Sequence, residues 1–172
     1  MLMPPRVRKV ALILHVGSSV GWVGAVIAFL ALAIAAVTNT DENLIRALYV
    51  SMDVLGTSVL VPLSIASLTT GIIQSLGTPW GLIRHYWVIV KLVITFVSTV
   101  ILVLYLQTLA ALAEAATDPG TAIGPGEILP TMSPVLHAGA ALVVLALALG
   151  LSIYKPRGLT GYGTPARTRA SS

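Results

Sequence analysis

The stretch LHVGSSVGWVGA, residues 14–25, puts a histidine, two serines, a tryptophan and three glycines inside a long apolar run. The run covers residues 10–37, and about 20 apolar residues are enough for a helix to cross a ~30 Å hydrocarbon core. Three similar runs follow, over residues 47–76, 86–113 and 131–154. The pattern predicts an all-α membrane protein, a bundle of four antiparallel transmembrane helices.

The composition favours the same class of protein. Of the 172 residues, 56% are hydrophobic and 9% are charged, whereas soluble domains average about 25% charged residues. The chain has no cysteine, which excludes disulfides and thiolate metal sites. We expect a single transmembrane domain over residues 1–155 and a basic, partly disordered cytoplasmic tail over residues 156–172.

The net charge of +4 reflects topology and does not point to nucleic-acid binding. Eight of the ten basic residues flank the runs on one side of the predicted bundle: Arg6, Arg8, Lys9, Arg84, Lys155, Arg157, Arg167 and Arg169. Under the positive-inside rule this side is the cytoplasm. We therefore expect both termini to lie inside.

When successive residues of the first run are placed about 100° apart around a helix axis, they form two stripes along the helix. One stripe holds small residues, which allow membrane helices to approach closely; its glycines, Gly17, Gly21 and Gly24, predict a contact in a homo-oligomer. The other stripe carries polar and aromatic side chains: His15, Ser18, Ser19 and Trp22. Both stripes are expected to face protein.

Polar residues of the four runs fall at two depths. A rise of about 1.5 Å per residue puts His15 and Lys91 ~9 Å inside the inner boundary. The same inner layer includes Ser18, Ser19, Ser67 and Gln74. An outer layer is predicted from Asp53, His137 and Tyr105.

The depths restrict metal binding by the three histidines. His15 and His137 lie about 17 Å apart along the membrane normal, whereas metal–nitrogen bonds are about 2 Å long. His85 begins the third run, off the face that carries Lys91. We expect it to meet lipid headgroups or a cytoplasmic neighbour.

Asp or Lys at the centre of a membrane helix costs at least ~2.5 kcal/mol, so each ionisable residue in a run needs an explanation. That explanation can be structural or functional. Structurally, Lys91 extends to the inner interface, Asp53 is a hydrogen-bonded acid near the outer surface, and the histidines bond between helices. Functionally, Asp53 orients His137 toward haem iron, a metal ion or a proton.

The functional interpretation predicts a haem b protein that transfers electrons or carries out small redox chemistry with membrane quinol. A haem held by one histidine, or by a histidine and another weak ligand, is compatible with these depths. His15 and His137 are the candidate iron ligands, and Lys91 or Arg84 is a candidate partner for the haem propionates. Three more side chains complete the predicted cofactor site: Trp22, Asp53 and Tyr105. Whether the protein is an enzyme stays open.

Copper near one histidine is an alternative cofactor, because imidazole suits copper. The candidate metal ligands are then His15, His137 and His85. A second class of function is a structural or accessory subunit without cofactor, which docks a partner through the small stripe of the first run. A third is a small transporter, which is less favoured because four short-looped spans need oligomerisation to form a path.

Four segments resemble an uncharacterised family of actinobacterial four-helix membrane proteins: LHVGSSVGWVGA, LSIASLTTGIIQSLGTPWGL, RHYWVIVKLVIT and YKPRGLTGYG. More distantly, they resemble the membrane domains of the copper-resistance protein D type. The residues that carry this likeness are His15, Trp22, Gly24, Thr70, Gly71, Trp87 and Lys91. The resemblance implies a four-helix fold in a bacterial plasma membrane and an association with haem or copper. The four methionines form no Met-rich run, which weakens copper transport.

Overall fold

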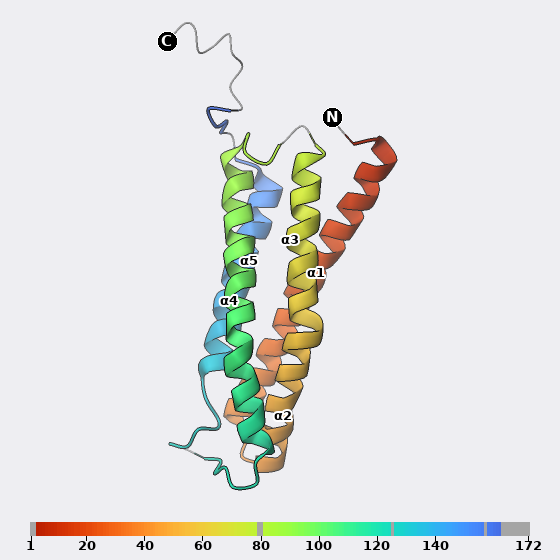
Figure 1. Cartoon of the computed structure of the whole chain (residues 1–172). Coiled ribbons are helices and arrows are strands. Elements are labelled where there is room, and N and C mark those ends of the chain that lie inside the picture. The colour runs from red at the N-terminus through yellow and green to blue at the C-terminus, as the bar shows by residue number, and fades with distance from the viewer. Residues whose placement is uncertain (1–2, 79–80, 125, 157, 163–172) are drawn as a thin grey trace, which may run out of the picture.

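The computed structural model describes residues 3–78, 81–124, 126–156 and 158–162. Its elements are α1 (Pro5–Thr38), α2 (Glu42–Leu55), the π-helical segment η1 (Gly56–Leu60), α3 (Val61–Leu76), α4 (Tyr86–Thr117) and α5 (Ser133–Tyr154). Because α2, η1 and α3 follow one another without a break, the helices form four antiparallel rods (Figure 1).

Four helical units are long and apolar enough to cross a membrane: α1, the continuous unit Glu42–Leu76, α4 and α5. They contain 34, 35, 32 and 22 residues, and about 20 are required. The predicted fold class, an all-helical membrane bundle, is therefore confirmed. Most of the predicted tail lies outside the described residues, so its predicted disorder stays a prediction.

Two helices begin before their apolar runs because their first turns are polar. α1 begins at Pro5, whose fixed φ suits the first turn of a helix. α2 begins at Glu42, after Asp41, whose carboxylate accepts hydrogen bonds from the backbone N–H groups of Asn43 and Leu44. Hydropathy therefore locates the middle of each helix better than its ends.

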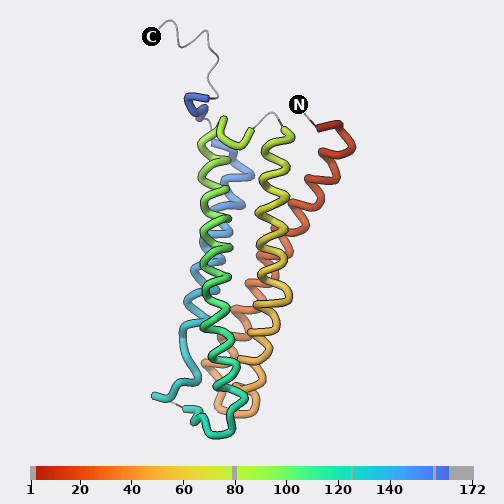
Figure 2. Tube along the Cα trace, in the orientation of Figure 1, coloured from red at the N-terminus to blue at the C-terminus, as the bar shows by residue number. Residues whose placement is uncertain are grey.

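The two ends of the bundle differ in their connections. The start of α1, the end of α3, the start of α4 and the end of α5 lie together at what we call the terminal end (Figure 1). The opposite loop end carries connections 39–41 and 118–132. Toward the terminal end, α1 diverges from α4 and α5 (Figure 2). There, the backbone N–H of Met3 donates to the carbonyl oxygen of Gly77.

The four rods form a square in which diagonal partners do not touch along their backbones. In the described part of the chain, α1 packs against α2, α3 and α5, and α4 packs against the same three helices. Among the described residues, backbone contact is absent between α1 and α4, and between α5 and either α2 or α3. Side chains from diagonal helices can therefore meet only across the bundle interior.

A π-helical segment interrupts the second rod, a feature that the prediction of one continuous run over 47–76 missed. Pro62 has no N–H group and its ring crowds the carbonyl group four residues earlier. The backbone N–H of Val61 instead bonds to the carbonyl oxygen of Gly56, five residues earlier. Gly56 faces α4 closely, since a Cβ there would lie 2.9 Å from a Leu109 methyl group.

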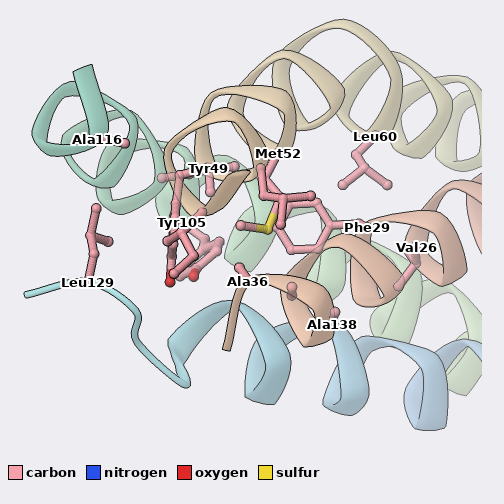
Figure 3. Packing of buried hydrophobic residues seen from close by; sticks show 14 of the residues in the cluster. Val26, Phe29, Ala36, Tyr49, Met52, Leu60, Tyr105, Ala116, Leu129 and Ala138 are labelled. Atoms are coloured by element: carbon pink, nitrogen blue, oxygen red, sulfur yellow. The ribbon is translucent and has the colours of Figure 1, made fainter. Parts of the chain in front are cut away.

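The apolar core lies in the half of the bundle nearer the loop end (Figure 3). Its largest fully buried side chains include Tyr49, Met52, Leu109 and Leu129. Many large apolar side chains on the outside of the rods are exposed, as expected for a lipid-facing surface. The terminal half has fewer buried apolar side chains, and its interior is more polar.

Two side chains of α2 fix the long connection at the loop end. The guanidinium of Arg46 donates to the backbone oxygens of Ala116, Asp118 and Thr121 at 2.7–3.0 Å. These bonds satisfy carbonyl groups at and beyond the end of α4, where intrahelical donors are missing. The hydroxyl of Tyr49 accepts from the backbone N–H of Thr131 at 2.8 Å, just before α5.

Candidate functional site

His15 of α1 is held by α3 in the terminal half of the bundle. Its Nδ1 lies 3.2 Å from the backbone oxygen of Ser67 and 3.2 Å from Oγ1 of Thr70. Gly71 leaves space for the ring, because a Cβ at that position would lie 3.0 Å from Cε1 of His15. The imidazole therefore fits against α3 because residue 71 has no side chain.

Lys91 of α4 reaches the other nitrogen of the same ring. Its Nζ lies 3.3 Å from Nε2 of His15. The carbonyl oxygen of Ser67 can only accept, so we assign the ring proton to Nδ1, and Nε2 then accepts from the Lys91 ammonium. Because α1 and α4 are diagonal, this contact crosses the interior of the bundle. We call His15, Ser67, Thr70 and Lys91 the His15–Lys91 cluster.

Serine hydroxyls extend the cluster along the contact between α1 and α3. Ser19 Oγ lies 2.8 Å from Ser67 Oγ. Ser18 Oγ donates to the backbone oxygen of His15 at 3.1 Å. The structure thus brings together five of the six residues of the predicted inner layer: His15, Ser18, Ser19, Ser67 and Lys91.

Helix faces and depths do not predict the contacts that Thr70 and Gly71 make with His15. The two residues follow Ser67 by three and four positions, so all three lie on one face of α3. That spacing is the sequence signal for the surface on which His15 rests.

A cavity of about 340 Å³ lies beside the His15–Lys91 cluster. All four rods contribute to its wall, and most of the wall is apolar. Its polar lining beyond the cluster includes Ser19, Gln74, Thr95 and Ser152. The cavity lies toward the terminal end, where α1 diverges from α4 and α5 (Figure 2).

The cavity wall carries charge of one sign. Lys91 and Lys155 line it, and none of the described lining residues is acidic. Oε1 of Gln74, the sixth residue of the predicted inner layer, is buried and has no hydrogen-bond partner. Buried polar atoms are usually paired. Negative charge in a ligand would therefore complement the lysines of this wall, and a hydrogen-bond donor would complement Gln74.

His137 of α5 lies in a different environment, nearer the loop end. Its ring stacks on Tyr105 of α4, with centroids 4.0 Å apart and planes inclined by 19°. Nδ1 of His137 lies 2.9 Å from the backbone oxygen of Ser133, one turn earlier, and donates to it. A mostly apolar groove of about 160 Å³ adjoins both rings and includes Trp22. His137 and Tyr105 therefore meet, as the predicted outer layer requires.

The predicted pairing of Asp53 with His137 is wrong. Oδ1 of Asp53 is buried without a hydrogen-bond partner, and Nδ1 of His137 is oriented by Ser133 instead. Asp53 belongs to α2, which has no backbone contact with α5 among the described residues. Depth along the membrane gives two residues the same level, but it does not say which helices are neighbours.

Arg84 and His85 lie in the connection between α3 and α4, beside the C-terminal segment. The backbone oxygen of Arg84 accepts from the N–H of Thr160 at 2.9 Å. His85 forms an isolated antiparallel bridge with Leu159, and its ring centroid lies 6.4 Å from that of Trp87. Neither Arg84 nor His85 is among the described residues that line the cavity or the groove.

The small stripe of α1 largely faces away from the bundle, whereas both stripes were expected to face protein. Apart from the nearby backbone of α1, a Cβ on Gly17 or Gly24 would meet no described atom within 4 Å. A Cβ on Gly21 would lie 3.5 Å from Leu63 of α3, so this glycine is at the edge of the helix contact. Trp22 is 3% exposed and belongs to the core, as its stripe predicts.

The histidines differ in how well they suit a metal or haem iron. Within the described residues there is no group of three or more His, Asp or Glu side chains able to hold a metal ion. His15 fits poorly, because its Nδ1 is held by Ser67 and Thr70 and its Nε2 faces the Lys91 ammonium, which has no lone pair for a metal. His137 fits better, since its backbone-bonded Nδ1 leaves Nε2 as the ligand, an arrangement common in metal sites.

No family model, curated protein or solved structure matches this chain. The resemblance to actinobacterial four-helix proteins therefore stays an expectation. The features that bear on function are the His15–Lys91 cluster, the cavity beside it, and the surroundings of His137.

Proposed function

We propose that this chain is an integral membrane protein that binds a small membrane-soluble molecule in the cavity beside the His15–Lys91 cluster. The supporting observation is the contact between His15 and Lys91 across the bundle, at the wall of a cavity of about 340 Å³. Apolar walls with a few convergent polar groups and volumes of roughly 300–1,000 Å³ are typical of small-molecule sites. Ionisable side chains within a membrane most often mark such functional sites.

The polar groups have distinct roles in this proposal. Lys91 keeps N–H groups beyond the one that it donates to His15, and these donate to an oxygen of the ligand. His15 positions the ammonium, because its own Nδ1 is fixed by Ser67 and Thr70. Gln74 offers its unpaired amide oxygen to a ligand hydroxyl. Membrane quinol, the redox partner expected from the sequence, combines such oxygens with an apolar tail.

In this proposal the ligand enters the cavity from the lipid bilayer. Leu12 and Val16 of α1 and Leu149 of α5 line the cavity and are also exposed on the outside of the bundle. The cavity is therefore reached from the lipid side between α1 and α5. If the terminal end is cytoplasmic, as the positive-inside rule predicts, the site lies toward the inner leaflet.

The test is recovery of hydrophobic compounds that copurify with the protein from a mild detergent, measured by chromatography and mass spectrometry. Ser152→Trp fills the cavity, whereas Leu147→Trp on the same helix places the same side chain at an exposed position. We expect a compound enriched with the unmodified protein and with Leu147→Trp, and lost from Ser152→Trp. Equal recovery from all three proteins would refute the proposal.

A second candidate function is haem-dependent electron transfer, supported by the orientation of His137. A haem held by Nε2 of this residue would supply one-electron chemistry with quinol. His137→Ala should then abolish a Soret band that His15→Ala retains. Absence of the band after expression with added haem would eliminate this candidate and leave the cavity proposal intact.

A further inference from the structure

We infer that the cavity takes a single-chain amphiphile with an anionic head group, a long-chain fatty acid whose carboxylate binds Lys91. This inference rests on the proposed function and specifies the chemical class of its ligand.

The first argument is charge. In the described part of the chain, the hydrogen-bond partner of Lys91 is His15, which is neutral in the assigned tautomer. Lys155 adds a second cation to the wall, and no described lining residue is acidic. An ammonium removed from water is stabilised when an anionic oxygen accepts its hydrogen bonds. A carboxylate supplies this anion, whereas the hydroxyl of an alcohol or of quinol does not.

The second argument is the choice of acceptor for Lys91. An aspartate at position 15 would form an ion pair with the ammonium and cancel its charge. The imidazole of His15 instead accepts one hydrogen bond and contributes no negative charge. Nζ is thereby fixed at the cavity wall with its charge available to a ligand.

The third argument is size and direction. A volume of about 340 Å³ is at the low end for ligand sites. It suits a head group with the first part of one chain better than a two-chain phospholipid. The exposed apolar wall formed by Leu12, Val16 and Leu149 lets the rest of the chain lie against α1 and α5 in the lipid.

The test is binding of tritiated palmitate to the full-length protein in detergent, with unlabelled competitors. We expect saturable binding that palmitate displaces, while hexadecanol, which has the same chain without charge, and two-chain phosphatidylglycerol displace it at least tenfold less well. Lys91→Met should weaken palmitate binding about tenfold or more, and Lys91→Arg should restore it to within a few fold. Lys9→Met, an exposed cation at the same end of the bundle, is the matched control and should bind normally.

The outcomes separate the inference from the proposed function. Equal displacement by hexadecanol, or unchanged palmitate binding by Lys91→Met, overturns the anionic class while leaving a cavity ligand in place. Equal displacement by phosphatidylglycerol overturns the inference that the ligand has a single chain. Palmitate binding by Ser152→Trp at the level of the unmodified protein places the palmitate outside the cavity and overturns this inference, while the copurification test still decides the proposed function. Melting temperatures of all variants identify any that fail to fold.

Discussion

At the scale of single residues, Lys91 decides between the structural and the functional interpretation of the site. Extension of its side chain to the inner interface would leave the ammonium among headgroups. Instead, its Nζ bonds to His15, a residue of the diagonal helix, at the wall of an interior cavity. A cation in this position stabilises the bundle little, because its desolvation opposes what its hydrogen bond contributes.

Replacement of Lys91 by methionine tests whether the desolvation cost of the ammonium offsets the stabilisation from its hydrogen bond. In protein freed of lipid, Lys91→Met should leave the free energy of unfolding unchanged or raise it by about 1 kcal/mol, since replacing buried charge by apolar volume is often neutral or stabilising. Thermal or denaturant unfolding in detergent measures the change. A loss of about 3 kcal/mol or more would show instead that Lys91 is a structural residue.

At the scale of helices, the connection between α4 and α5 depends on one guanidinium. Arg46 bonds to three backbone oxygens that no helix donor satisfies. Hydrogen bonds from charged groups contribute about 1.5–3 kcal/mol when buried, and these are partly exposed. We expect Arg46→Met to lower the free energy of unfolding by about 2 kcal/mol. Arg46→Lys should restore only part of that loss, because a single ammonium cannot span all three oxygens. Unfolding in urea compares the variants, and a neutral Arg46→Met would contradict this role.

The small stripe of α1 makes a separate prediction about association. Gly17→Leu adds bulk where a Cβ has no neighbour within 4 Å among the described residues beyond the adjoining backbone of its own helix, so the monomer should fold normally. If copies of the chain or another subunit dock on this face, Gly17→Leu should lower the mass of the assembly measured by light scattering in detergent. Gly21→Leu is less suitable, because it also presses on Leu63 of α3. An unchanged mass would argue against docking through the stripe.

The presence of four helices could be predicted from the sequence, whereas the pairs of helices that pack together could not. Four apolar runs predict four rods, and the rise per residue puts His15 and Lys91 at one level. The same arithmetic puts Asp53 with His137, which is wrong because their helices are diagonal and neither side chain crosses the interior to the other. Lys91 is long enough to reach across to His15, and Gly71 provides the space that the ring needs. The need for space at Gly71 becomes clear only when α1 and α3 are placed side by side.

At the scale of the whole molecule, the charge distribution predicts which end faces the cytoplasm. The chain has no cysteine, so single cysteines report on topology without removal of native ones. Thr40→Cys at the loop end and Tyr162→Cys at the terminal end both replace exposed residues. In intact bacterial cells, a membrane-impermeant maleimide should label Thr40→Cys. Tyr162→Cys should be labelled only after permeabilisation. The reverse pattern would move the cavity to the outer leaflet.

The uneven position of the core has a consequence for motion. The loop half is held by packed aromatic and aliphatic side chains and by the bonds of Arg46, whereas the terminal half has fewer buried apolar side chains and contains the cavity. Local opening is easiest where few apolar contacts must be broken. The rods can therefore spread at the terminal end while the loop end stays closed, so that exchange of a bound molecule proceeds on its own timescale, independent of global unfolding.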